Sequence, residues 1–183
     1  MKRRTLIALL FISFACAAAQ DKQDKKDTEK LAPYYPTPET VVERMLKLGG
    51  LKAGEKMFDL GSGDGRIVIM AADKFKADAT GVEFDADLYK QSMDRIRALG
   101  LDKRARIIHG DIAKQDFSSS DLLTVYLLPS SNDKIRPMLE KQLKKGTRIV
   151  AHDFMFQGWT PAKEEHIEDD GEGRSHTLYL YIR

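Results

Sequence analysis

A glycine-rich turn between an apolar strand and a helix constrains the fold of this chain more than any other feature. Residues 56–60, Lys-Met-Phe-Asp-Leu, predict a short strand, and Gly-Ser-Gly-Asp-Gly follows it directly. The apolar residues 67–72 then predict a helix. Because glycine lacks Cβ, the backbone can turn sharply here and a ligand can approach it closely. In an open α/β sheet, ligands bind at the carboxyl ends of the strands, where such a turn lies.

Two acids beside the turn indicate the kind of ligand. Asp59 stands at the tip of the strand and Asp64 lies inside the turn. A dinucleotide fold places a pyrophosphate on the following helix, and two carboxylates would repel that group. They suit a cationic amino-acid end, as in S-adenosylmethionine, which carries an ammonium, a sulfonium and no phosphate. The arrangement resembles the first motif of the class I methyltransferases; the alternative is an ordinary turn without a ligand.

Strands and helices alternate along the rest of the chain. Besides 56–60, strands are predicted at 79–83, 105–109, 121–129, 147–154, 163–168 and 176–183. Helices are predicted at about 38–48, 66–75, 85–99 and 135–145. This count predicts an α/β fold with a Rossmann-like, doubly wound, seven-stranded sheet. It is mostly parallel, with an antiparallel last strand and helices on both faces.

Acids also follow the next two strands. Glu83 lies close to the offset of about 20 residues at which an acid meets ribose hydroxyls in Rossmann-type sites. Phe84 could pack on an adenine face. Asp111 and Ile112 follow the third strand, and Asp111 resembles the position in the methyltransferases that hydrogen-bonds the adenine amino group. The alternative for Glu83 is a helix cap or a surface acid.

The segment before the first helix, residues 31–38, is rich in proline and tyrosine. Thr37 is expected to cap that helix, with Pro38 at its first position. The helix could simply cover one side of the sheet. Alternatively, Tyr34, Tyr35 and Thr37 could form a lid over the cofactor.

A closer resemblance covers the whole mature chain. Its most specific part is the run 59–69, supported by Tyr35-Pro36-Thr37, residues 41–46, Gly81-Val82-Glu83, Pro129 and Trp159-Thr160-Pro161. These segments are similar to the seven-strand protein-lysine methyltransferases that modify the ATP synthase c-subunit and the adenine nucleotide translocase in mitochondria, and to their bacterial relatives. The tip of the fourth strand, Tyr126-Leu127-Leu128-Pro129, differs from an Asp/Asn-Pro-Pro-Tyr motif, which argues against DNA adenine or glutamine methylation.

The resemblance implies an S-adenosylmethionine-dependent methyltransferase that modifies a protein lysine. A small-molecule methyltransferase and a non-catalytic module that binds an adenosine-type ligand remain alternatives. Tyr126 and Asp153 are candidate acceptors for the substrate proton, and no metal ligands are assigned. The predicted cofactor-binding residues are Tyr35, Thr37, Asp59, Gly61, Ser62, Gly63, Asp64, Gly65, Glu83, Phe84, Asp111 and Ile112.

The N-terminus has the pattern of a targeting segment. Residues 1–19 combine a basic start, an apolar stretch and Ala-Ala-Ala, which predicts a cleaved signal peptide and an exported protein. An uncleaved, membrane-tethering anchor is the alternative. Residues 20–33 are predicted to be a charged flexible linker, and 34–183 the methyltransferase domain. Export raises a conflict, since S-adenosylmethionine is made in the cytosol.

Charge gives no argument for a nucleic-acid partner. The chain has 30 basic and 28 acidic residues, so its formal net charge is +2. The expected partner is a protein or small-molecule methyl acceptor, with no nucleic acid, and contact with a membrane only through an uncleaved leader. A monomer is expected.

Overall fold

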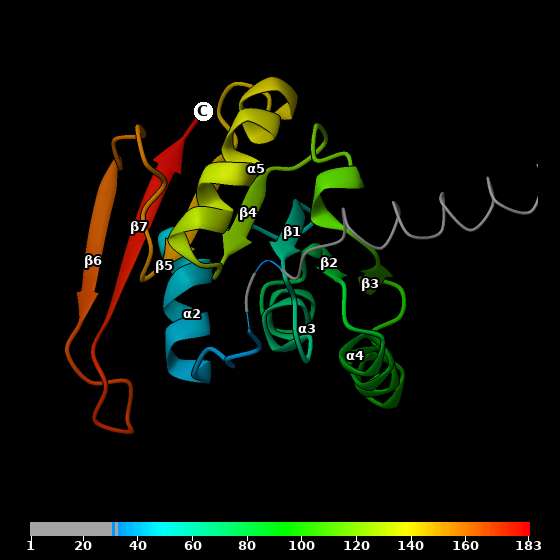
Figure 1. Cartoon of the computed structure of the whole chain (residues 1–183). Coiled ribbons are helices and arrows are strands. Elements are labelled where there is room, and N and C mark those ends of the chain that lie inside the picture. Colours follow the sequence, from blue (N-terminus) through cyan, green and yellow to red (C-terminus); the bar gives the residue numbers. More distant parts are fainter. Residues whose placement is uncertain (1–30, 32) are drawn as a thin grey trace, which may run out of the picture. The chain divides into compact units, whose positions relative to one another are not determined.

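The computed structural model describes residue 31 and residues 33–183 of the chain (Figure 1). The predicted signal peptide, 1–19, lies outside the described residues, as does most of the predicted linker, 20–33. Within the described part, no helix combines the length and the apolar character that a membrane span requires.

The described residues form one seven-stranded sheet, in the order β3-β2-β1-β4-β5-β7-β6. The first five strands in this order pair in parallel, and β7 is antiparallel to both β5 and β6. The predicted architecture, including the antiparallel last strand, is therefore confirmed. The strands are β1 (Lys56–Leu60), β2 (Asp78–Glu83), β3 (Ala105–His109), β4 (Leu122–Val125), β5 (Arg148–His152), β6 (Lys163–Ile167) and β7 (His176–Ile182).

Helices cover both faces of the sheet because its strands are apolar on both faces. In β5, Val150 packs into one buried cluster, whereas its neighbours Ile149 and Ala151 pack into the other. The first cluster is closed by α2, α3 and α4, and the second by α5 and η1. These helices are α2 (Glu39–Leu48), α3 (Arg66–Asp73), α4 (Ala86–Ala98), η1 (Ile112–Lys114) and α5 (Pro129–Gln142).

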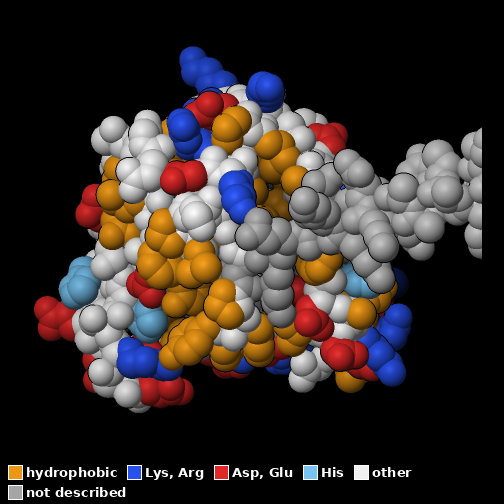
Figure 2. Space-filling model, viewed as in Figure 1, with side chains coloured by type: hydrophobic (Ala, Val, Ile, Leu, Met, Phe, Trp, Pro, Cys, Tyr) orange, Lys and Arg blue, Asp and Glu red, His pale blue; other side chains and the backbone are white. Residues whose placement is uncertain are grey.

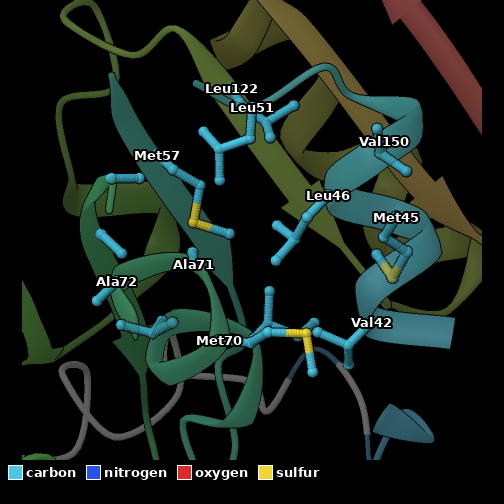
Figure 3. Close-up of a cluster of buried hydrophobic side chains, with 14 of the residues drawn as sticks. Val42, Met45, Leu46, Leu51, Met57, Met70, Ala71, Ala72, Leu122 and Val150 are labelled. Carbon is cyan, nitrogen blue, oxygen red and sulfur yellow. The ribbon is translucent and has the colours of Figure 1, made fainter. Parts of the chain in front are cut away.

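The apolar face of α2 fixes the segment that precedes it against the sheet. Met45 and Leu46 are fully buried, and Figure 3 shows Leu46 pointing toward Met57 of β1. Burying side chains of this size contributes about 1.5–3 kcal/mol each. The helix therefore anchors residues 33–38 beside the carboxyl ends of the strands.

The helix after β4 begins earlier than predicted. It was expected at 135–145, but α5 starts at Pro129, soon after β4 ends at Val125. Proline suits the first position of a helix because its missing N–H would have no partner there. The extended Leu128 is the N-cap, and its carbonyl accepts from the N–H of Ser131. The predicted strand 121–129 is accordingly too long.

The prediction that Thr37 caps the first helix is wrong. Pro38 occupies the N-cap of α2, and no side chain caps that helix. Thr37 lies one residue further out, and its hydroxyl forms a hydrogen bond of 3.3 Å with Nδ1 of His152. Thr37 thus joins the N-terminal segment to the end of β5.

Candidate active site

The site lies at the carboxyl ends of the neighbouring strands β1 and β4. β1 pairs with β2 on one side and β4 on the other, so the connections after these two strands leave toward opposite faces. Such a switch point leaves a crevice at the carboxyl ends of the strands, where ligands bind in open α/β sheets. The glycine turn follows β1, Glu83 ends β2, Asp111 follows β3, Tyr126 follows β4 and Asp153 follows β5.

The glycine turn has a backbone that only glycine adopts readily. Gly61, Gly63 and Gly65 have φ of 83°, 54° and 77°, in the left-handed region that costs other residues about 1–2 kcal/mol each. A Cβ on Gly63 would lie 2.8 Å from Cε2 of Tyr34. The tyrosine ring therefore packs directly against the turn. The buried Ser62 fits because its side chain lies against Gly81, which has none.

Glu83 holds the turn in place. Its Oε2 accepts a hydrogen bond of 2.7 Å from the N–H of Gly63, and its Oε1 accepts one of 2.8 Å from the N–H of Asp85. Glu83 is buried. Each carboxylate oxygen can accept a further hydrogen bond, so the side chain can anchor the turn and still receive ligand hydroxyls.

Asp59 is a buried acid beside this turn. Its Oδ1 accepts a hydrogen bond of 2.7 Å from Oγ1 of Thr124 on β4. Burial raises the pKa of Asp59 to about 7, and the negative charges of Glu83 and Asp64 add to the effect, although the Thr124 hydroxyl opposes it. Among the described residues, neither Asp59 nor Glu83 forms a salt bridge. A cationic ligand group would supply the positively charged partner that these two carboxylates lack.

Asp64, unlike Asp59 and Glu83, forms salt bridges with arginine side chains. Its Oδ2 receives hydrogen bonds of 2.9 Å from Nη2 of Arg66 and 2.7 Å from Nη1 of Arg95. Burial opposes ionisation, but the two guanidinium groups hold the pKa of Asp64 below its usual range. Arg66 also donates to the carbonyl of Thr37, at 2.9 Å. The predicted cofactor residue Asp64 thus fastens the N-terminal segment to the turn.

The N-terminal segment crosses the site, as in the lid interpretation, but its two tyrosines diverge. Tyr34 packs on the turn at Gly63. Tyr35, the one assigned to the cofactor, accepts a hydrogen bond of 2.7 Å at its hydroxyl from Arg174, in the β6–β7 connection. The lid interpretation included both tyrosines, but the sequence alone could not show that their side chains contact different parts of the site.

The residues assigned to the adenine end lie on two connections. Phe84 is exposed after β2, and the exposed His109 contacts its carbonyl through Nε2 at 3.1 Å. Oδ1 of Asp111 accepts from the N–H of Ala113, so Asp111 caps η1. Ile112 is buried in the core. The order of β1, β2 and β3 in the sheet brings Asp59, Glu83 and Asp111 to one edge, as the sequence predicts.

Tyr126 and Asp153 meet at the tips of β4 and β5. The hydroxyl of Tyr126 donates to Oδ2 of Asp153 at 3.3 Å. Burial, followed by the charge of Asp153, raises the pKa of Tyr126 to about 12. The phenol is therefore protonated at neutral pH, and of the two predicted proton acceptors the carboxylate is the one that accepts here.

The structure adds residues that the sequence did not single out. His152 is fully buried, its ring lies 3.9 Å from that of Tyr126, and its Nε2 is 2.9 Å from Nδ1 of His176 on β7. His176 in turn lies beside Asp153 and Asp170. The only sequence signal was the His-Asp pair that ends the fifth strand. No spacing rule connects it to a histidine 24 residues later.

Comparison with known proteins identifies the family. Residues 59–163 match the ANTKMT methyltransferase domain. The chain belongs to this methyltransferase family. The resemblance found in the sequence is thereby confirmed, and so are the predicted enzyme class and the seven-strand methyltransferase fold.

Relatives extend over most of the described residues. A protein-lysine N-methyltransferase of Saccharolobus islandicus is 40% identical over 151 residues, covering 82% of this chain and 92% of that protein. The human lysine N-methyltransferase of the ATP synthase c-subunit is 31% identical over 139 residues, and the match covers 76% of this chain and 58% of the human protein. The crystal structure of a Salinibacter ruber RNA methyltransferase in complex with S-adenosyl-L-homocysteine matches with a TM-score of 0.74 and 39% identity. That match covers 81% of this chain and 93% of the other.

Proposed function

We propose that this enzyme transfers a methyl group from S-adenosylmethionine to lysine amino groups of a protein. The observation that carries the proposal is the pair of buried carboxylates, Asp59 and Glu83, on either side of a glycine turn. This donor set fits a ligand with a cationic amino-acid end and free hydroxyls. The Salinibacter relative, which was crystallised with the demethylated form of the same cofactor, supports it.

The residues present would hold the cofactor in three parts. The glycine turn and Asp59 would hold the amino-acid end, Glu83 would accept from the ribose hydroxyls, and Asp111 would accept from the adenine amino group. Phe84 would lie beside the adenine, and Tyr34 packs against the turn at Gly63. When bound, S-adenosylmethionine supplies an electrophilic methyl group. The transfer then depends mainly on positioning, with reacting atoms about 3–3.5 Å apart.

The substrate end of the site is set by the tips of β4 and β5. The protonated Tyr126 hydroxyl donates to Asp153, and the ring of His152 packs against the ring of Tyr126. A lysine amine must arrive there without its proton, and desolvation favours the neutral amine. Thr37, which is hydrogen-bonded to Nδ1 of His152, borders this position.

Two features favour a protein acceptor. The Saccharolobus and human relatives are both named as lysine methyltransferases that act on proteins. In addition, large apolar side chains remain exposed around the carboxyl ends of the strands, and Figure 2 shows hydrophobic side chains gathered on the face turned to the viewer. Exposed apolar surface of this kind is typical of macromolecular contacts. The side chains next to the site are Tyr34, Tyr35, Phe84, Leu128 and Met155.

A direct test compares acceptors. The full chain would be incubated with S-adenosylmethionine carrying a labelled methyl group and with arrayed lysine peptides, RNA or free lysine in separate reactions. Mass spectrometry would locate the label. We expect label on peptide lysines with the wild-type chain and little with Glu83→Gln. Label only on RNA, as the description of the Salinibacter relative would suggest, or only on free lysine would refute the protein acceptor. Cofactor binding without label on any acceptor would favour a binding module.

We also propose that the protein is exported, or else tethered to a membrane by its leader, and that its domain is monomeric. The basis for export or tethering is the pattern of residues 1–19. Fractionation of cells that express the full chain, with mass determination of its N-terminus, would test this. An uncleaved, soluble cytosolic protein would contradict the proposal, and light scattering of the purified chain would test for a monomer.

A further inference from the structure

Three metal-ligating atoms converge at the end of β5. Nε2 of His152 lies 2.9 Å from Nδ1 of His176 and 3.4 Å from Oδ2 of Asp153, and the last two atoms are 3.0 Å apart. His152 ends β5 and Asp153 follows it, whereas His176 begins β7. The antiparallel pairing of these two strands brings the three side chains together.

These distances fit an ion that is bound by all three atoms and lies outside their plane. Imidazole nitrogens and carboxylate oxygens bind Zn²⁺ at about 2.0–2.2 Å. Ligands at that distance, with bond angles between octahedral and tetrahedral values, lie about 3.0–3.5 Å from one another. The three observed separations are close to this range.

In each of the three side chains, the nitrogen or oxygen that faces away from the cluster has a hydrogen-bond partner, as is usual for metal ligands. Nδ1 of His152 is bonded to the Thr37 hydroxyl at 3.3 Å, and Nε2 of His176 lies 3.3 Å from Oδ2 of Asp170. Oδ1 of Asp153 accepts a hydrogen bond of 2.9 Å from the backbone N–H of Thr177 on β7. Metal-bound histidines almost always donate their second N–H to such a partner, which fixes the direction of the other nitrogen.

The backbone conformation of Asp153 and the burial of the two histidines also indicate a constrained site. Asp153 has φ of 58°, a left-handed conformation that is uncommon outside glycine and marks a constraint on the residue. It turns the carboxylate back toward the two histidines. His152 is fully buried and His176 nearly so, which distinguishes this cluster from the exposed acidic groups common on protein surfaces.

We propose that His152, Asp153 and His176 bind a divalent transition-metal ion. Two imidazoles and one carboxylate suit Zn²⁺ and chemically similar ions rather than Mg²⁺ or Ca²⁺, which prefer oxygen ligands. The ion would tie β5 to β7 and, through Thr37, to the segment that covers the site. It would lie beside the substrate end, since the Tyr126 hydroxyl is 3.3 Å from the same Asp153 oxygen.

The test measures metal binding and does not depend on methyl transfer. The full chain, stripped with a chelator, would be titrated with ZnCl₂ by calorimetry, and Co²⁺ would report coordination through its visible absorption. Asp153→Asn keeps the side-chain shape and tolerates the left-handed backbone, and His176→Asn removes an imidazole. His109→Asn is the matched control, because three strands lie between β3 and β5.

We expect one Zn²⁺ per chain, a rise in melting temperature on binding, and affinity weakened at least about tenfold in Asp153→Asn and His176→Asn but not in His109→Asn. No uptake by the folded wild-type chain would overturn the proposal, as would equal affinity in all four proteins. Should both variants fail to fold, anomalous diffraction from wild-type crystals with Zn²⁺ decides. An ion bound to the three named atoms supports the site, and an ion bound elsewhere overturns it.

Discussion

Replacing Asp59 with asparagine should stabilise the ligand-free protein and weaken its binding of a cationic ligand. The side chain is fully buried, and its neighbours Glu83 and Asp64 are also acidic. In the absence of a cationic ligand, an ionised Asp59 is therefore unfavourable. Asparagine has the same shape and can still accept the hydrogen bond from Thr124, so Asp59→Asn removes the charge with little change in packing.

The size and the pH dependence follow from the raised pKa. The unfolded chain releases the Asp59 proton near the ordinary value of 3.8, whereas the folded chain keeps it until about 7. Between these values the unfolded state binds fewer protons, so the free energy of unfolding falls as pH rises and is constant above about 7. The difference is about three pH units at about 1.4 kcal/mol each, an upper limit of about 4 kcal/mol. Relaxation of the site reduces this to roughly 2–4 kcal/mol.

Urea unfolding of the ligand-free proteins at several pH values measures this effect. At pH 8, Asp59→Asn should be more stable than the wild-type chain by about 2–4 kcal/mol, and the two should converge below about pH 4. The exposed Asp94→Asn should change stability by less than about 0.5 kcal/mol. The reasoning is refuted if Asp59→Asn is no more stable than wild type at pH 8, or if the difference does not depend on pH.

Three further predictions concern the glycine turn and its neighbours. Gly63→Ala should lower stability by at least about 1–2 kcal/mol, measured by urea unfolding, because φ is 54° and the new Cβ would lie 2.8 Å from the ring of Tyr34; unchanged stability would contradict this. Asp64→Asn should cost about 1–3 kcal/mol at pH 7, and the loss should shrink as pH falls below about 4, since the pKa of this acid is lowered; a loss independent of pH would count against the two arginine contacts. Thr124→Val removes the hydroxyl that favours ionised Asp59, so calorimetry should show weaker S-adenosylmethionine binding at pH 7 that recovers at pH 9, whereas equal weakening at both values would disprove this coupling.

The fold could be predicted from the sequence because local signals agreed with the global pattern. Three strands of the parallel part, β1, β2 and β4, are each a short apolar run followed by a turn and a helix, and these connections permit few arrangements. The antiparallel last strand followed from the turn at residues 169–173. The start of α5 was missed because Ser130, Ser131 and Asn132 are typical of loops, although they continue the helix that Pro129 begins.

The convergence of the residues assigned to the cofactor could be anticipated because they lie at strand ends, where the topology alone brings them together. Asp59 and Glu83 lie at the ends of β1 and β2, and Asp111 follows the neighbouring β3. The neutralisation of Asp64 could not be foreseen, since Arg95 reaches it from α4, 31 residues along the chain.

The substrate side was harder to predict for two physical reasons. In the segment of residues 31–38 no periodicity fixes the direction of a side chain, so Tyr34 and Tyr35 could not be distinguished. The cluster of His152, Asp153 and His176 depends on the register of β7 against β5 and on a left-handed backbone at Asp153. Neither feature leaves a pattern in the sequence.

Calorimetric titration of the full chain with S-adenosylmethionine, beside Glu83→Gln, tests the central claim most directly. Glu164→Gln, on the exposed side of β6, is the matched control. We expect saturable binding by the wild-type chain and the control, weakened at least about tenfold, or about 1.4 kcal/mol, in Glu83→Gln. Absence of binding by a folded wild-type chain, or equal binding by Glu83→Gln, would contradict the account of this site.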